Sequence, residues 1–123
     1  MLTLIKNAEI FTPRPLGCGY LLLGGGKILL TGVGEPDFDT GLLTETVDME
    51  GAPVGPGLID CHVHVTGGGG EDGFSTQAPP VPLTGFTRHG VTSVVGLRGT
   101  DVETRSTASL LARTRALREE GLS

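Results

Sequence analysis

Aromatic residues are scarce in this chain of 123 residues: they make up 4% of it, and tryptophan is absent. A core must therefore be built mainly from Leu, Val, Ile and Ala, which an apolar content of 37% allows. Basic residues are also few, with 9 Lys and Arg against 14 Asp and Glu, so the formal charge is −5. Because nucleic-acid-binding surfaces are basic, we expect no nucleic-acid partner.

Cysteines and long apolar runs are also lacking. The two cysteines, Cys18 and Cys61, provide no disulfide framework, and we expect reduced thiols. No stretch is long and apolar enough to span a membrane. The N-terminus has neither the charged region nor the cleavage site of a signal peptide. These absences predict a cytoplasmic protein without a membrane partner.

Glycine and proline are abundant, with 21 and 8 residues. In the first half of the chain they separate short apolar runs, as turns do in β-rich regions. Strands are predicted at Leu2–Ile5, Ala8–Phe11, Tyr20–Leu23, Lys27–Val33 and Glu45–Asp48, with a hairpin turn at Gly24–Lys27 and a polar loop at Gly34–Gly41. We therefore expect residues 1–54 to form part of a small antiparallel sheet or β-sandwich.

From residue 55 the pattern changes to strand, helix, strand, helix. Leu58–Val65 and Val91–Leu97 are apolar on both faces, as in strands that are buried on both sides. Helices are predicted at Val81–His89 and Ser106–Glu120, the second with Ser106 as its N-cap and Gly121 as its stop. This order predicts an α/β fold in which residues 55–123 are the first two βα units. Since two parallel strands do not complete such a sheet, we expect the chain to be a truncated one.

Two histidines close the first of these strands, in the stretch GLIDCHVHVTGGGGEDG (residues 57–73). Alternate side chains share a face of a strand, so Asp60, His62 and His64 are expected to point the same way. Two imidazoles on one face can reach a single Zn²⁺, and the carboxyl end of a parallel strand is where sites form. His62 and His64 are therefore candidate metal ligands. The alternative is that both rings are merely packed or half-exposed.

Four consecutive glycines and two acidic residues follow the histidine pair. The glycines can act as a flexible connector, or they can let the backbone approach a ligand closely. Glu71 and Asp72 could ligate metal, pair with a cationic substrate group, or lie in a solvated loop. The loop after the second strand should reach the same edge, where Thr100 could hydrogen-bond a ligand. We expect Asp101 to start a helix and His89, at the opposite end of that strand, to be structural.

The segment PGLIDCHVHV, preceded by a short β-rich region, resembles the entry to the barrel of the amidohydrolase superfamily. The longer match, through GGGGEDG, GVTSVVGLRGTD and SLLARTRALREEGLS, is similar to the isoaspartyl (β-aspartyl) dipeptidase branch. This resemblance implies a (β/α)8 TIM-type barrel that is joined to a small β-sandwich and holds two zinc ions. It also implies that His62 and His64 bind metal, whereas Gly69, Glu71 and Thr100 hold the α-ammonium group of a small dipeptide.

Such a barrel needs about 250 residues. The resemblance places the remaining metal ligands, a carboxylated lysine and two histidines, and the aspartate base on later strands, so no catalytic residue is expected here. We interpret the chain as the N-terminal fragment of a zinc-dependent hydrolase of β-aspartyl dipeptides, inactive by itself and homo-oligomeric when complete, as the family implies. Two alternatives stay open: an amidohydrolase acting on cyclic amides, as dihydroorotase and hydantoinase do, and a non-catalytic binding module.

Overall fold

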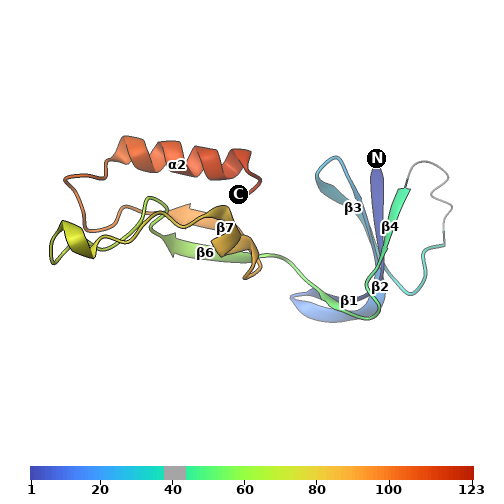
Figure 1. Ribbon diagram of the computed structural model, residues 1–123. Helices are drawn as coiled ribbons and strands as arrows, with labels where there is room; N and C mark the ends of the chain where they lie inside the picture. The colour runs from blue at the N-terminus through green and yellow to red at the C-terminus, as the bar shows by residue number, and fades with distance from the viewer. Residues whose placement is uncertain (38–43) are drawn as a thin grey trace. The chain divides into compact units, whose positions relative to one another are not determined.

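The computed structural model describes residues 1–37 and 44–123 (Figure 1). These residues form two compact units, Met1–Pro56 and Gly57–Ser123. The polar loop predicted at residues 34–41 falls partly on positions 38–43, which lie outside the described residues. Within the described ranges, no helix has both the length and the apolar character that crossing a membrane requires.

The first unit contains one mixed sheet. Its strands are β1 (Leu2–Thr12), β2 (Arg14–Gly24), β3 (Lys27–Val33), β4 (Thr44–Asp48) and β5 (Pro53–Val54). β2 pairs antiparallel with both β1 and β3, whereas β4 and β5 both run parallel to β1. The expectation of an antiparallel sheet is therefore wrong for β4 and β5, because β4 begins beside the start of β1, with Thr44 opposite Leu2, and then follows it. The β-sandwich stays a prediction.

The two short strands predicted within residues 2–11 are one strand, β1, whose pairing with β2 is irregular after Ile5. Asn7 lies at this irregularity with a positive φ of 51°. Its side-chain amide donates to both carboxylate oxygens of Asp48, over 2.9 and 2.8 Å. Irregularities of this kind bend a strand. The buried core cluster of the unit lies around this irregularity and consists of Ala8, Ile10 and Leu21.

The second unit has the predicted order of strand, helix, strand and helix. Its elements are β6 (Leu58–Val63), the 3-10 helix η1 (Phe74–Thr76), α1 (Leu83–Thr87), β7 (Val91–Gly96) and α2 (Thr107–Glu119). β6 and β7 pair in parallel, and α2 runs along them (Figure 1). The buried core consists of Val63, Val65, Phe86, Leu117 and Leu122. The α/β class of this unit is thus confirmed, whereas a closed barrel stays a prediction.

Both ends of α2 are fixed as predicted. The hydroxyl of Ser106 accepts from the amide of Ser109 (3.1 Å), and the Ser109 hydroxyl accepts from the amide of Ser106 (3.0 Å), which makes a capping box. At the other end Gly121 has a φ of +101°. The amide of Leu122 then donates to the carbonyl of Leu117 (2.9 Å). This is a Schellman motif, and both leucines belong to the core.

β6 is less covered than its apolar sequence predicts. Leu58 and Ile59 are 60% and 68% exposed, and within the strand only Val63 is buried. The sheet has two strands, and of β6 only Val63 belongs to the core cluster. The rest of the strand therefore has no covering layer among the described residues, and the expectation that both of its faces are buried is wrong for this chain.

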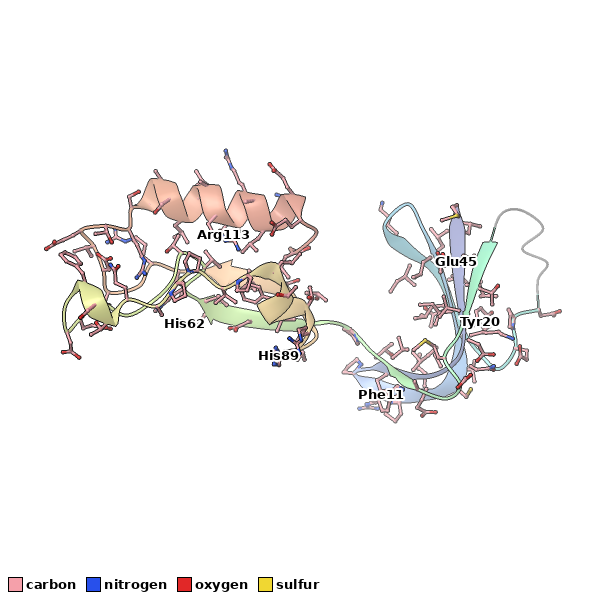
Figure 2. All side chains as sticks on the ribbon, viewed as in Figure 1. Phe11, Tyr20, Glu45, His62, His89 and Arg113 are labelled. Atoms are coloured by element: carbon pink, nitrogen blue, oxygen red, sulfur yellow. The ribbon has the colours of Figure 1, made fainter. Side chains whose placement is uncertain are left out.

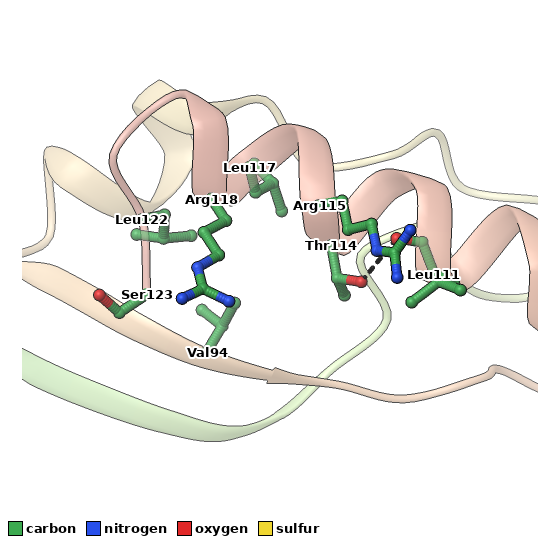
Figure 3. Close-up of a pocket in the computed structure, with 8 residues that line it drawn as sticks. All are labelled: Val94, Leu111, Thr114, Arg115, Leu117, Arg118, Leu122 and Ser123. Atoms are coloured by element: carbon green, nitrogen blue, oxygen red, sulfur yellow. Dashed lines mark hydrogen bonds between the residues drawn. The ribbon is translucent and has the colours of Figure 1, made fainter.

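A pocket of about 290 Å³ lies between α2 and β7 (Figure 3). It is lined by Val94, Leu111, Thr114, Arg115, Leu117, Arg118, Leu122 and Ser123. Ser123 also pairs with β7: its amide donates to the carbonyl of Thr92 (3.0 Å), and its carbonyl accepts from the amide of Val94 (2.7 Å). None of the residues predicted to bind metal or substrate lines this pocket.

Candidate functional site

The two histidines lie at the carboxyl end of β6. His62 is inside the strand (Figure 2), and His64 follows directly after its last residue, Val63. Their ring centroids are 5.3 Å apart, and the ring planes are tilted by 46°. The side chains therefore lie on the same face, as the alternation of a strand predicts. Since Zn–N bonds are roughly 2.1 Å long, rings at this spacing can both direct a nitrogen at one ion. Metal binding itself stays a prediction.

Among residues 1–37 and 44–123, no third potential metal ligand is grouped with this pair. The carboxylate of Asp60, which was expected to point the same way, accepts a hydrogen bond from the backbone amide of His62 (3.0 Å). Neutral imidazoles are suitable donors for Zn²⁺, and catalytic zinc sites use three protein ligands. The donors present here therefore fit part of a zinc site.

The His64 ring packs against two glycines. A Cβ built on Gly68 would lie 3.4 Å from Nδ1 of His64, and one built on Gly99 would lie 3.3 Å from the same atom. One glycine follows β6 and the other follows β7, so the two loops meet at this ring. Because both glycines lie against Nδ1, Nε2 is the ring nitrogen remote from them.

The glycine loop, defined here as residues 66–78, packs against itself. A Cβ on Gly67 would lie 2.3 Å from the carbonyl oxygen of Ala78, and one on Gly69 would lie 2.5 Å from that of Thr76. Both glycines also have positive φ angles, +97° and +70°, which side chains disfavour. The outgoing segment thus runs backbone against backbone with the returning one, and the loop is not an open, flexible connector.

The three residues expected to hold an ammonium group lie close to one another. The hydroxyl of Thr100 donates to the carbonyl of Gly69 over 3.4 Å. The Glu71 carboxylate accepts from its own amide and from Thr100, and these bonds, with the charge that His64 can carry, lower its pKa; loss of hydration opposes them. Glu71 is therefore held ionised beside other oxygen acceptors, which suits the three N–H donors of an ammonium group.

Glu71 and Thr100 border an open pocket of about 340 Å³. The pocket is lined by Gly70, Glu71, Gly73, Phe74, Thr100, Asp101, Val102 and Glu103. The lining includes three carboxylates and no basic side chain. A site with one sign of charge raises the local concentration of the opposite ion, so the lining favours a cationic group over an anionic one.

Asp101 has a role other than the predicted one. It does not start α2, which is capped by a later residue. Its carboxylate is buried, with the residue 8% exposed, and accepts from the amides of Glu103 (3.0 Å) and Thr104 (2.9 Å). It also accepts from the side chains of Thr104 and Gln77. Asp101 therefore shapes the loop after β7 and ties it to the glycine loop.

Arg105 was not singled out from the sequence, although it contacts the glycine loop directly. Its Nη1 donates to the carbonyl of Gly68 (3.0 Å), and its Nη2 donates to the carbonyl of Ala78 (2.9 Å). No sequence signal marks this contact, because both acceptors are backbone carbonyls and any residue type could supply them. Gln77, the partner of Asp101, escapes sequence reasoning for a similar reason, since a single glutamine in a loop has no pattern.

The other residues noted in the sequence lie apart from these contacts. His89 (Figure 2) follows the short helix α1, and its Nδ1 lies 3.0 Å from the carbonyl oxygen of Gly85 within that helix. This contact agrees with a structural role. Cys18 and Cys61 are both exposed and form no disulfide.

Comparison with known proteins gives whole-chain matches among solved structures. Two structures of the β-aspartyl dipeptidase of Fervidobacterium islandicum AW-1, one of them in complex with the dipeptide β-Asp-Leu, match all of this chain at 41% sequence identity. The TM-scores are 0.91 for the complex and 0.93 for the other structure, and the chain covers 32% and 33% of them. A D-hydantoinase shares the fold, with a TM-score of 0.67 and 23% identity over 95% of this chain and 24% of its own.

The sequence relatives are shorter matches. The imidazolonepropionase of Streptococcus gordonii is 44% identical over 78 residues, which is 62% of this chain and 18% of that protein. The imidazolonepropionase of Streptococcus sanguinis is 39% identical over 91 residues, 60% of this chain and 22% of that protein. The chain thus spans about a fifth of these relatives. No protein-family model matches it.

Proposed function

With the resemblance of this chain to the amidohydrolase superfamily confirmed by its relatives and structural neighbours, we propose that it is the N-terminal part of a metal-dependent hydrolase of β-aspartyl dipeptides. The observation that carries this proposal is the match of the entire chain, at 41% identity, to a β-aspartyl dipeptidase that binds β-Asp-Leu. The grouping of Gly69, Glu71 and Thr100 supports it independently of any relative.

A β-aspartyl dipeptide carries a free ammonium group beside the amide to be cleaved. In the proposed complex this ammonium donates to the Glu71 carboxylate and to the carbonyl of Gly69. The lowered pKa of Glu71 keeps the carboxylate charged, so the contact is a charge-assisted hydrogen bond. The ammonium would thereby orient the substrate, with its scissile amide toward the histidine pair.

We assign His62 and His64 as ligands of zinc, of which the complete enzyme is expected to hold two ions. When bound, zinc would supply Lewis-acid polarisation of the scissile carbonyl. The two imidazoles of this chain, at the end of β6, would hold and orient the ion. Because the described residues offer only these two grouped ligands, we expect the 123-residue chain alone to hydrolyse no dipeptide.

A second candidate is a cyclic-amide hydrolase of the imidazolonepropionase type. It is favoured by the 44% identity to the Streptococcus gordonii protein. That match covers 62% of this chain, whereas the dipeptidase matches all of it. The ammonium-binding grouping at Glu71 also has a clear use in a dipeptidase, so we rank the dipeptidase first.

The test uses the full-length protein that contains this chain, loaded with zinc and assayed with β-Asp-Leu, its N-acetylated form and imidazolonepropionate. We expect hydrolysis of β-Asp-Leu and poor turnover of the acetylated dipeptide, which has no ammonium group. Turnover of imidazolonepropionate without turnover of β-Asp-Leu would replace the proposal by the second candidate. Equal turnover of the free and acetylated dipeptides would remove the proposed role of Glu71.

A further inference from the structure

A backbone hydrogen bond joins the two ends of the glycine loop. The amide of Ala78, on the returning segment, donates to the carbonyl of Gly68, on the outgoing one, over 2.8 Å. Arg105 contacts the same two residues, since one nitrogen of its guanidinium donates to the carbonyl of Gly68 and the other to the carbonyl of Ala78. A single side chain therefore joins both sides of the loop.

This contact depends on the shape of arginine as well as on its charge. A guanidinium is a planar fork whose nitrogens donate in fixed directions, whereas a lysine ammonium is a point charge on a flexible stem. Each of the two carbonyls here is contacted by a different guanidinium nitrogen. A side chain at position 67 would displace the fork, because a Cβ on Gly67 would lie 2.8 Å from Nη2 of Arg105.

A second contact holds the returning segment at the neighbouring residue. The side-chain amide of Gln77 donates to the carboxylate of Asp101 and to the hydroxyl of Thr104 (3.0 Å). Asp101 is itself fixed by the amides of Glu103 and Thr104. We call residues 101–105 the bracket. The bracket hydrogen-bonds the glycine loop at two neighbouring residues: Asp101 and Thr104 bind the side chain of Gln77, and Arg105 binds the carbonyl of Ala78.

The loop closure adjoins the candidate ammonium site along the chain. Gly68 precedes Gly69, whose carbonyl accepts from Thr100, and Glu71 follows in the same loop. Thr100 directly precedes the bracket. If the closure at Gly68 opened, the Gly69 carbonyl and the Glu71 carboxylate would no longer be fixed relative to Thr100.

We propose that Arg105 is a positioning residue for the ammonium site. By tying the carbonyls of Gly68 and Ala78 together, it holds Gly69 and Glu71 beside Thr100. Its effect on the loop is a property of this chain, whereas its effect on substrate recognition rests on the proposed function.

The effect on the loop is tested by hydrogen–deuterium exchange with mass spectrometry on the 123-residue chain. In Arg105→Gln we expect amides of the glycine loop, including that of Ala78, to exchange about 10-fold faster, as loss of a charged hydrogen bond predicts. Amides of α2 should be unchanged, because the side-chain hydrogen bonds that Arg105 makes within the described residues go to Gly68 and Ala78, both in the glycine loop. Arg105→Lys should exchange like Arg105→Gln, since one ammonium does not reproduce the fork. The matched control is Arg115→Gln, an exposed arginine on α2 that lines the separate pocket of Figure 3.

Three outcomes would overturn the proposal. Unchanged exchange in Arg105→Gln would show that the loop closes without the guanidinium. Full rescue by Arg105→Lys would show that charge alone suffices. Equal acceleration in the glycine loop and in α2 would make Arg105 a residue for the stability of the whole unit.

The effect on recognition is measured in the full-length protein with β-Asp-Leu. We expect KM to rise about 10-fold in Arg105→Gln, as the loss of one charged contact to the substrate would cause, while kcat stays within about 3-fold. A faster-exchanging loop with an unchanged KM would overturn the positioning role. If wild-type protein does not hydrolyse β-Asp-Leu, the proposed function fails, and the exchange experiment still decides whether Arg105 holds the loop.

Discussion

The hydroxyl of Thr100 lies 3.4 Å from the carbonyl oxygen of Gly69 and also hydrogen-bonds the carboxylate of Glu71. One hydroxyl has a single hydrogen to donate, so the two acceptors share one donor. Each keeps capacity for a further hydrogen bond. A ligand that brings several N–H donors, as an ammonium group does, would satisfy both acceptors, which gives this small cluster of oxygens a chemical preference before any relative is considered.

The substitution Glu71→Gln tests that preference most directly. It keeps the shape of the side chain and removes its charge, so we expect kcat/KM for β-Asp-Leu in the full-length protein to fall about 10-fold or more. Zinc content should be unchanged, because we assign Glu71 to substrate. Steady-state kinetics and metal analysis on both proteins give the two measurements.

N-acetyl-β-Asp-Leu is the control substrate for this variant. It has no cation for Glu71 to bind, so it should be poor for the wild type and lose little further on mutation. Loss of metal from Glu71→Gln would make Glu71 a ligand. An equal loss on both substrates would place the residue in the chemistry or in the folding of the loop.

Asp101 should make the glycine loop sensitive to acid. The side-chain and backbone hydrogen bonds of Thr104, the amide of Glu103 and the charge of Arg105 hold its pKa below the ordinary value of 3.8, against the opposing effect of burial. A carboxylate with a depressed folded-state pKa stabilises the fold above its unfolded-state pKa, and the stabilisation is lost as pH falls through the folded-state value. Protection of the loop, which Gln77 ties to Asp101, should therefore decline below pH 3.8.

The measurement is hydrogen–deuterium exchange from about pH 5 to about pH 2.5, corrected for intrinsic rates, with α2 as the internal reference. In Asp101→Asn the loop should exchange faster at pH 5 and show no such decline. A decline of the same size in Asp101→Asn, or one shared by α2, would assign the acid sensitivity to other groups.

The elements of the second unit were predictable because their signals are local. Ser106 and Gly121 mark the ends of α2 through contacts within a few residues, and the period of a strand alone puts His62 and His64 on one face. The direction of β4 was not predictable, because an alternating apolar pattern carries no information about which strand it will pair with.

The contacts that shape the site lay beyond sequence reasoning for a related reason. Arg105 reaches Gly68 across 37 positions, and Gln77 reaches Asp101 across 24. The acceptors of Arg105 are main-chain carbonyls, which every residue has. The glycine run indicated that something approaches the backbone closely, and the structure identifies the returning segment of the same loop, at Thr76 and Ala78.

The core of the second unit depends on Leu117, which is 1% exposed. Replacing such a leucine by alanine removes buried apolar contacts and leaves a cavity, so we expect Leu117→Ala to lower the free energy of unfolding of this unit by about 2–5 kcal/mol. Urea denaturation followed by circular dichroism at the helical band reports on α2. The matched control is Leu111→Ala on the same helix, 51% exposed, which should change stability much less. Equal losses in the two variants would contradict the assigned core.

Zinc binding by the 123-residue chain tests the histidine pair without relying on activity. Two imidazoles whose centroids are 5.3 Å apart provide fewer ligands than the three of a usual catalytic site, so we expect weak binding, roughly micromolar or weaker, by isothermal titration calorimetry. Either His62→Ala or His64→Ala should abolish the signal, because one imidazole is left. His89→Ala is the control, since His89 contacts the carbonyl of Gly85 and is expected to leave zinc binding unchanged. Binding that survives in both single variants, or tight stoichiometric binding that depends on His89, would rule out the pair as the metal ligands of this chain.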